Sequence, residues 1–319
     1  MPGADGEPDA RRTLLLLIVV GLIWGSAYPV IRFGIVSGAT PITFAAVRYA
    51  FSAAAMAVLA ILLAVRRPSA RSLGTSALLG IPVVGVYGLL LYVGEGTTSG
   101  GLASILIATT PLLTALFALP ALPGERLPRL GYVGLVVGFV GAFVLVVPPP
   151  GIRLASSVWG PVEVVGAAIS FAAGSVVLRR IRPEGETLWG VSVQFLTAAA
   201  VLGITLPLLE PRAGLPLTGS VLLSLAYLVA LPSVAGYALY FYLHHRVGPG
   251  RANVVAYVNP IAALTIGILV FAEPFRWWEL AGFGLVLIGL TLLTRAKRPP
   301  EPAPDLEARD GGRTTVRRP

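Results

Sequence analysis

The sequence predicts an all-α integral membrane protein with ten transmembrane helices, arranged as two inverted five-helix repeats. Of its 319 residues, 55% are hydrophobic and only 12% are charged. The mean hydropathy is +0.82, a balance far from that of a soluble domain. The apolar residues gather in runs of membrane-spanning length, and the second half of the chain repeats patterns of the first.

The ten apolar runs each approach the ~20 residues that about 30 Å of hydrocarbon requires of a helix. They cover residues 13–35, 41–65, 73–94, 98–121, 130–148, 159–178, 187–209, 219–243, 250–272 and 277–294. Runs this rich in Leu, Val, Ala and Gly satisfy their backbone groups as helices, whereas barrel strands would alternate polar and apolar residues. The first run begins like a secretory signal after Arg12, but it continues past Ala27 to spanning length.

The chain divides into two repeats with short polar segments around them. Residues 13–148 form the first repeat, 149–158 an inter-repeat loop and 159–295 the second repeat. Residues 1–12 and 296–319 are polar, rich in Pro and Arg, and lack periodicity. We expect both to be cytoplasmic tails, with residues 1–10 and about 296–319 disordered.

The placement of positive charge predicts the orientation of the bundle. Fifteen basic residues fall in alternate connections and near the termini, namely Arg11, Arg12, Arg66, Arg67, Arg71, Arg126, Arg129, Arg179, Arg180, Arg182, Arg246, Arg251, Arg295, Lys297 and Arg298. The opposite connections hold four, namely Arg32, Arg153, Arg212 and Arg276. We therefore expect a multi-pass protein of the plasma membrane, and the positive-inside rule places both of its termini in the cytoplasm. The net charge of +9 indicates topology and not a nucleic-acid surface.

The two halves match by eye at corresponding spans. The matched pairs are Pro82 with Pro232, Tyr87 with Tyr237, Tyr92 with Tyr242, Pro111 with Pro260, Glu125 with Glu273, Gly134 with Gly282, and Gly141 with Gly289. Weaker matches pair Arg48-Tyr49 with Gln194-Phe195 and Trp24 with Phe171. Because five is odd, the second half enters the membrane inverted, as in many secondary transporters.

These residues resemble the drug/metabolite transporter superfamily, specifically its EamA type, over about residues 13–295. The resemblance is carried by Trp24-Gly25-Ser26-Ala27-Tyr28, by Arg48 after Pro41, by the Pro111 helix before Gly124-Glu125-Arg126-Leu127, and by Pro260 with Glu273-Pro274. It implies export of amino acids, metabolites or toxic compounds through a central cavity formed by spans 1, 3, 4, 6, 8 and 9.

Prolines at equivalent places in both halves predict where the solute site lies. Pro82, Pro111, Pro232 and Pro260 each remove a backbone hydrogen bond, so we treat them as helix-break or gating candidates. The alternative is a structural kink relieved by neighbouring Thr or Asn side chains. Polar and aromatic residues nearby are the cavity candidates: Trp24, Tyr28, Tyr87, Thr109, Thr110, Tyr237, Tyr240, Asn253, Tyr257 and Asn259. Each has a plainer alternative as a packing or interhelical hydrogen-bonding residue.

Three charged residues inside spans also call for an explanation. Arg48 is well inside span 2, where a charge costs about 2.5–3.5 kcal/mol, so it should face protein or water as a structural, gating or solute-binding group. Glu95 and Glu163 near the outer ends of spans 3 and 6 are candidates to carry a coupling proton. Glu163 also suits the first turn of a helix, where a carboxylate is favoured electrostatically.

Signatures of enzymes and metal centres are absent from the sequence. There is no Cys, only two His, no Walker loop and no His-Glu-x-x-His motif, so we expect no metal, no cofactor and no enzymatic activity. We predict a secondary transporter exporting a small organic metabolite, amino acid or drug-like compound by alternating access. Its expected partners are that solute, the lipid bilayer and a coupling proton or ion, in a monomer or homodimer, without nucleic acid. The alternatives are a membrane enzyme or lipid-handling protein using the same cavity, and a channel.

Overall fold

The computed structural model describes residues 6–122, 124–147, 158–181, 187–244, 254–274 and 276–296, and these residues are helical apart from short connections. The first repeat contains α1 (Gly6–Gly25), α2 (Ala27–Val36), α3 (Pro41–Leu62), α4 (Ala70–Gly80), η1 (Ile81–Val86), α5 (Tyr87–Glu95), α6 (Gly100–Ile107), α7 (Thr110–Ala121) and α8 (Arg129–Val146). The second contains α9 (Trp159–Ile181), α10 (Leu188–Leu209), α11 (Gly219–Leu228), η2 (Val229–Ala235), α12 (Gly236–His244), α14 (Val254–Phe271) and α15 (Trp277–Ala296).

These helices confirm the multi-pass membrane architecture. Nine helical stretches in the described residues are long and apolar enough to cross a bilayer. The tenth expected span, 250–272, is represented by the shorter apolar helix α14. Most spans begin and end within a few residues of the apolar runs, because charged and proline-containing connections end each run. Helix α1 begins earlier, at Gly6, so the expectation of disorder over residues 1–10 is wrong for residues 6–10.

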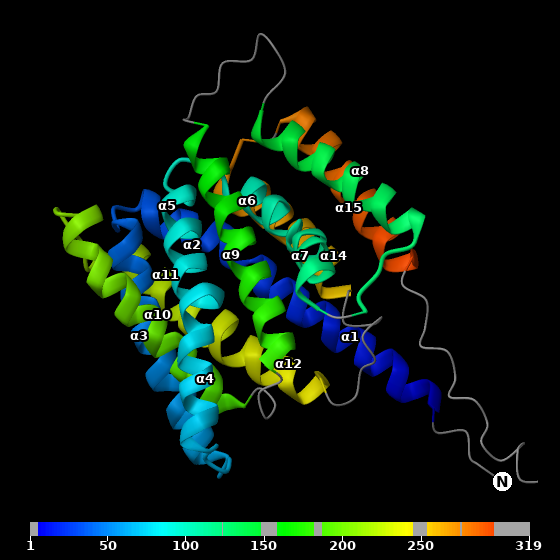
Figure 1. Cartoon of the computed structure of the whole chain (residues 1–319). Coiled ribbons are helices and arrows are strands. Elements are labelled where there is room, and N and C mark those ends of the chain that lie inside the picture. The colour runs from blue at the N-terminus through cyan, green and yellow to red at the C-terminus, as the bar shows by residue number, and fades with distance from the viewer. Residues whose placement is uncertain are drawn as a thin grey trace, which may run out of the picture.

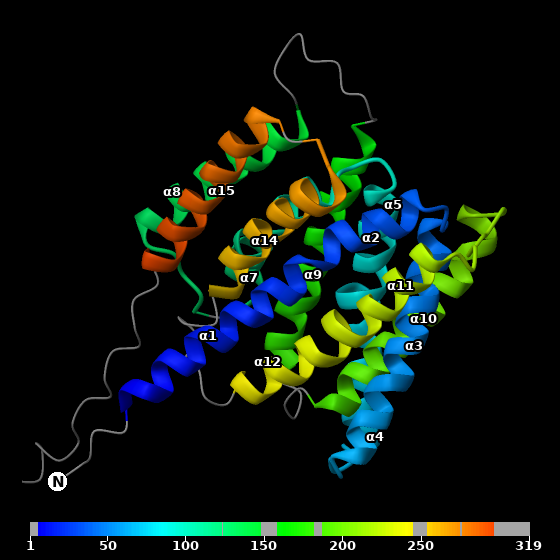
Figure 2. The same cartoon turned by 180° about the vertical axis from the view of Figure 1, so that it is seen from behind.

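The helices pack in antiparallel pairs on either side of a central group. In Figures 1 and 2, α8 and α15 run side by side along one edge, whereas α3 and α10 form the other. Helices α1, α7, α9 and α14 lie between these pairs. Helix α1 packs on α14, and its repeat equivalent α9 packs on α7, so the contacts of one half are mirrored in the other.

Close glycine contacts at the crossing of α8 and α15 show the pseudo-twofold relation directly. A Cβ added to Gly134 would lie 2.7 Å from the carbonyl oxygen of Gly289, and one added to Gly141 would lie 2.8 Å from that of Gly282. Gly134 is the repeat equivalent of Gly282, and Gly141 that of Gly289. Exchanging equivalent residues therefore turns the contact between Gly134 and Gly289 into the contact between Gly282 and Gly141, as a twofold interface requires.

The bundle has two faces, which we name by the chain ends. The terminal face is where α1 begins and α15 ends, and the opposite face is where α5 ends and α9 and α15 begin (Figure 1). Carboxylates hold helix ends together at the opposite face. Glu210 accepts hydrogen bonds from the backbone N–H groups of Ile42 (3.1 Å) and Thr43 (2.9 Å) and from the hydroxyls of Thr40 and Thr43 (both 2.6 Å).

These four hydrogen bonds cap the first turn of α3 with a residue from the other repeat. Burial opposes ionisation of the Glu210 carboxyl, but hydrogen bonds from Thr40, Thr43 and Ile42 outweigh it and lower the pKa of Glu210 below its usual value. The two repeats are thus joined by a carboxylate that stays ionised and favours the N-terminal end of a helix.

Candidate functional site

Two π-helical turns sit at the predicted proline positions and open the middle of the bundle. Pro82 lies in η1 and Pro232 in η2, at equivalent places in the two halves. The main-chain carbonyl of Pro232 accepts a hydrogen bond from Trp24 Nε1 at 3.0 Å, and that of Pro82 accepts one from Ser170 Oγ at 2.8 Å. Each proline turn is therefore tied to the first helix of the other repeat. Such wide turns often mark functional sites.

The helix of span 4 is interrupted at Pro111, whereas the equivalent span 9 is continuous through Pro260. Helix α6 ends at Ile107 and α7 begins at Thr110. The carbonyl of Ile107, which Pro111 deprives of its helical donor, accepts a hydrogen bond from the hydroxyl of Thr110 at 2.6 Å. Thr109 donates likewise to Leu106 at 2.6 Å. The first repeat therefore has an interrupted helix at this position, whereas the second repeat has a continuous one.

A cavity of about 430 Å³ lies between the repeats at the level of these prolines. Every span except the fifth and tenth contributes to it. Its lining is Trp24, Ala27, Tyr28, Ile31, Arg48, Tyr49, Val83, Val84, Tyr87, Leu91, Ser104, Ile107, Ala108, Thr110, Pro111, Phe171, Phe195, Pro232, Tyr237, Tyr240, Val255, Ala256 and Asn259. We call this space the central cavity.

The structure brings together most of the residues that the sequence singled out. Ten line the central cavity: Trp24, Tyr28, Arg48, Tyr87, Thr110, Pro111, Pro232, Tyr237, Tyr240 and Asn259. Four others lie outside its lining: Pro82, Thr109, Tyr257 and Pro260. Tyr257 lies 3.4 Å from the hydroxyl of Thr291 instead. Asn253 lies outside the described residues.

Aromatic rings from equivalent positions form the walls of the central cavity. Trp24 packs edge-on against Tyr237 with ring centroids 5.4 Å apart, and the equivalent pair Phe171 and Tyr87 repeats this contact at 5.6 Å. Tyr49 and Phe195, themselves equivalent, stack at 5.7 Å with planes 17° apart. The cavity thus carries the pseudo-twofold symmetry of the bundle in its side chains.

Tyr49, Phe171 and Phe195 are cavity residues that sequence reasoning had not proposed for the site. In the sequence these residues appear only in weak matches between the two halves. Because residues near a pseudo-twofold axis contact their own equivalents, positions that are aromatic in both halves could have been predicted to line the cavity.

Arg48 is the one charged residue among the described residues that line the cavity. Its side chain is 8% exposed, and its Nη1 donates to the hydroxyl of Tyr92 at 2.7 Å. The guanidinium carbon lies 5.4 Å from the ring centre of Tyr49, a cation–π contact. Among the described residues, Nε has no hydrogen-bond partner. The repeat equivalent, Gln194, is buried but does not line the cavity.

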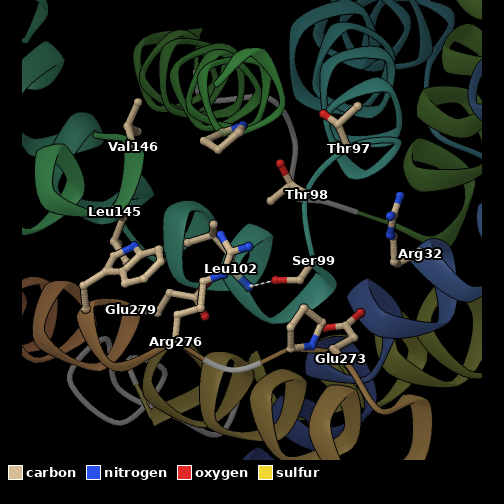
Figure 3. A pocket seen from close by; sticks show the side chains of 13 residues that line it. Arg32, Thr97, Thr98, Ser99, Leu102, Leu145, Val146, Glu273, Arg276 and Glu279 are labelled. Atoms are coloured by element: carbon tan, nitrogen blue, oxygen red, sulfur yellow. Dashed lines mark hydrogen bonds between the residues drawn. The ribbon is translucent and has the colours of Figure 1, made fainter. Parts of the chain in front are cut away.

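A second pocket, of about 260 Å³, is lined by residues from the opposite face, and we call it the outer pocket. Figure 3 shows its lining side chains. Arg32, Thr97, Thr98, Glu273, Arg276 and Glu279 contribute its polar lining. Arg32 Nη1 donates to the main-chain carbonyls of Glu95 and Gly96, both at 2.6 Å. The carboxylate of Glu273 accepts from the N–H groups of Gly100 and Gly101, both at 3.0 Å.

The two equivalent glutamates have different partners. Glu273, in the connection before α15, caps the start of α6 in the other repeat. Its repeat equivalent Glu125 forms an ion pair with Arg179 at 3.3 Å. Arg32 and Glu273 together hold both ends of the connection between α5 and α6, since a cation suits a helix C-terminus and an anion an N-terminus.

Comparison with known proteins agrees with this architecture. Residues 11–147 and 158–295 match the model of the EamA-like transporter family. The uncharacterized inner membrane transporter YedA of Escherichia coli (strain K12) is 33% identical over 293 residues, covering 88% of this chain and 90% of its own. A probable terminal-alkyne amino-acid exporter of Streptantibioticus cattleyicolor is 30% identical over 283 residues, covering 88% of this chain and 92% of its own.

A solved structure, described only as the crystal structure of a protein, superposes with a TM-score of 0.61 at 20% sequence identity. The match covers 89% of this chain and 97% of the solved one, and at that identity it shows a shared fold alone. The family match covers nearly all of both five-helix repeats. The chain belongs to the EamA-like transporter family.

Proposed function

We propose that the protein exports a small amphipathic solute that carries one carboxylate, such as an amino acid, by alternating access through the central cavity. The observation that carries this proposal is the chemistry of the cavity. Paired aromatic rings from both repeats surround a single buried cation, Arg48, whose Nε has no partner among the described residues.

The lining favours a particular class of solute. Trp24, Tyr87 and Tyr237 offer flat apolar surfaces for a hydrocarbon or aromatic body. Arg48 offers its guanidinium to a carboxylate, the anion whose geometry it matches best. A single cation suits one carboxylate and disfavours a multiply charged anion. A volume of about 430 Å³ is within the usual range of small-molecule sites.

The inverted repeats support alternating access. We assign the terminal face to the cytoplasm and the opposite face to the outside, following the positive-inside rule. Contacts of Arg32 and Glu273 then close the outer side of the bundle. Because the halves are related by a pseudo-twofold axis in the membrane plane, exchanging their conformations would close the inner side instead. Export is supported by the relative named as an amino-acid exporter.

Flux measurements test this proposal. The full chain is reconstituted in liposomes loaded with phenylalanine or propargylglycine, a terminal-alkyne amino acid, and entry of the same labelled compound is followed as counterflow. We expect saturable exchange that is lost in Trp24→Ala and kept in Trp277→Ala, because Trp277 is 66% exposed on the bundle surface. Absence of flux for amino acids, metabolites and cationic drugs alike would contradict export, and single-channel currents would indicate a channel instead.

A further inference from the structure

Glu95 is the most unusual charged residue of the described bundle. It is the last residue of α5, its side chain is 0% exposed, and neither of its carboxylate oxygens has a hydrogen-bond partner among the described residues. The hydroxyl of Thr98, one turn later and 3% exposed, also lacks a partner there. An ionised carboxylate left without donors in such a place costs several kcal/mol, so it requires an explanation in function.

Glu95 lies on a segment of the chain that borders the central cavity on one side of it and the outer pocket on the other. Leu91, one helical turn before it, lines the central cavity, whereas Thr97 and Thr98, just after it, line the outer pocket (Figure 3). The neighbouring helix α2 divides in the same way, since Ile31 lines the central cavity and Arg32 the outer pocket. Glu95 itself lines neither space and is fully buried, so it lies between the part of α5 that borders the central cavity and the turn that borders the outer pocket.

The charges around Glu95 leave its carboxyl group unpaired. Arg32 on α2 interacts with it electrostatically, but the guanidinium donates to the main-chain carbonyls of Glu95 and Gly96. Arg48 on α3 and Glu273 in the α14–α15 connection also act on it from a distance. Four tyrosines also interact with it electrostatically, namely Tyr28, Tyr49, Tyr87 and Tyr92. Helix α9, which packs against α5, carries Glu163 near its start. No described cation forms an ion pair with Glu95.

We propose that the Glu95 carboxyl group is a proton-binding site that couples solute export to proton entry. The carboxylate takes one proton from water of the outer pocket, becoming a neutral acid, and releases it toward the central cavity, so that one proton moves inward as solute moves outward. Proton binding at Glu95 stands independently, whereas the coupling rests on the proposed export function.

Arg32 would connect this proton to the opening of the outer side. With Glu95 neutral, the guanidinium stays on the two carbonyls that it holds at 2.6 Å, and the connection between α5 and α6 remains closed. Loss of the proton creates a buried anion beside that cation. Arg32 then has a stronger partner than the carbonyls, because ion pairs in a low-dielectric site outweigh hydrogen bonds to neutral groups.

The proton site can be tested without any solute. Infrared difference spectra of the full chain in liposomes, recorded as the pH is lowered, report the C=O stretch of each newly protonated carboxyl. We expect a band that is absent in Glu95→Gln, shifted in Glu95→Asp and unchanged in the matched control Glu163→Gln. A spectrum unchanged in both Glu95 variants would overturn the assignment, and the aspartate variant keeps the test decisive if the glutamine variant does not fold.

Coupling is tested with phenylalanine as the solute. A pH gradient is imposed with the acidic solution on the side of the membrane that the outer pocket faces. It should drive phenylalanine against its own concentration gradient in the wild type and in Glu163→Gln. In Glu95→Gln the side chain stays neutral and Arg32 should remain on the carbonyls of Glu95 and Gly96, so gradient-driven flux and counterflow should both fall, whereas Glu95→Asp should keep both. Gradient-driven flux that survives in Glu95→Gln, or that follows sodium instead, would overturn the proposal. Loss of counterflow in the wild type would instead count against the export function.

Discussion

Replacing Arg48 with glutamine tests which group of the solute the central cavity recognises. Nη1 of the guanidinium donates to the hydroxyl of Tyr92, whereas Nε has no partner among the described residues, so one edge of the group is available to a carboxylate. A hydrogen bond between charged groups contributes about 1.5–3 kcal/mol. At 1.4 kcal/mol per tenfold change, Arg48→Gln should weaken binding of a carboxylate solute by about 10- to 150-fold.

The assay compares an acid with its amide. Dissociation constants of phenylalanine and phenylalaninamide are measured by calorimetry on the purified protein. Arg48→Gln should weaken binding of phenylalanine and leave binding of phenylalaninamide nearly unchanged. Arg48→Lys should recover part of the affinity for phenylalanine, because it restores the charge without the planar geometry of the guanidinium. Arg67→Gln, a variant of a residue that packs on Trp189 outside the cavity, should change neither value. Equal losses for acid and amide would refute the assignment, since they would show that Arg48 supports the fold.

Three further predictions concern the scaffold. Gly289→Ala should destabilise the protein by about 1–3 kcal/mol, because its Cβ would lie 2.5 Å from backbone of α8, whereas Gly284→Ala on the same helix meets nothing within 4 Å and should be neutral in thermal unfolding. Glu273→Gln should lower the free energy of unfolding by about 1–2 kcal/mol, because it removes a helix cap. Glu125→Gln breaks an exposed ion pair and should lower it by under about 1 kcal/mol, so equal losses would contradict the capping role. The lowered pKa of Glu210 means that its stabilisation is complete above the usual carboxyl pKa and lost as pH falls through the folded value. The melting temperature should therefore fall less steeply in acid for Glu210→Gln than for the wild type, and parallel curves would contradict this.

The sequence predicted the spans well because membrane insertion makes length and hydropathy decisive. Backbone groups in hydrocarbon leave few alternatives to a helix of about 20 residues, so apolar runs correspond closely to helices. The repeat also pointed to residues that line the central cavity. Pro82 and Pro232 both occupy π-helical turns, and Pro111 and Pro232 both line the cavity.

The contacts of individual polar groups could not be predicted in the same way. Pro111 interrupts its helix and Pro260 does not, although the two match in sequence, because local hydroxyl donors and neighbouring helices decide the outcome. Glu210 and Glu273 cap helices of distant spans, a relation that sequence spacing does not contain. The isolation of the Glu95 carboxyl group likewise depends on where Arg32 points, because Arg32 donates to the main-chain carbonyls of Glu95 and Gly96.

The position of a bound solute tests the central claim most directly. A structure of the full chain with the transported amino acid should show its carboxylate beside Arg48 and its side chain between Trp24 and Tyr237, midway between the two repeats. A solute bound only in the outer pocket, or on the lipid-facing surface, would contradict the account.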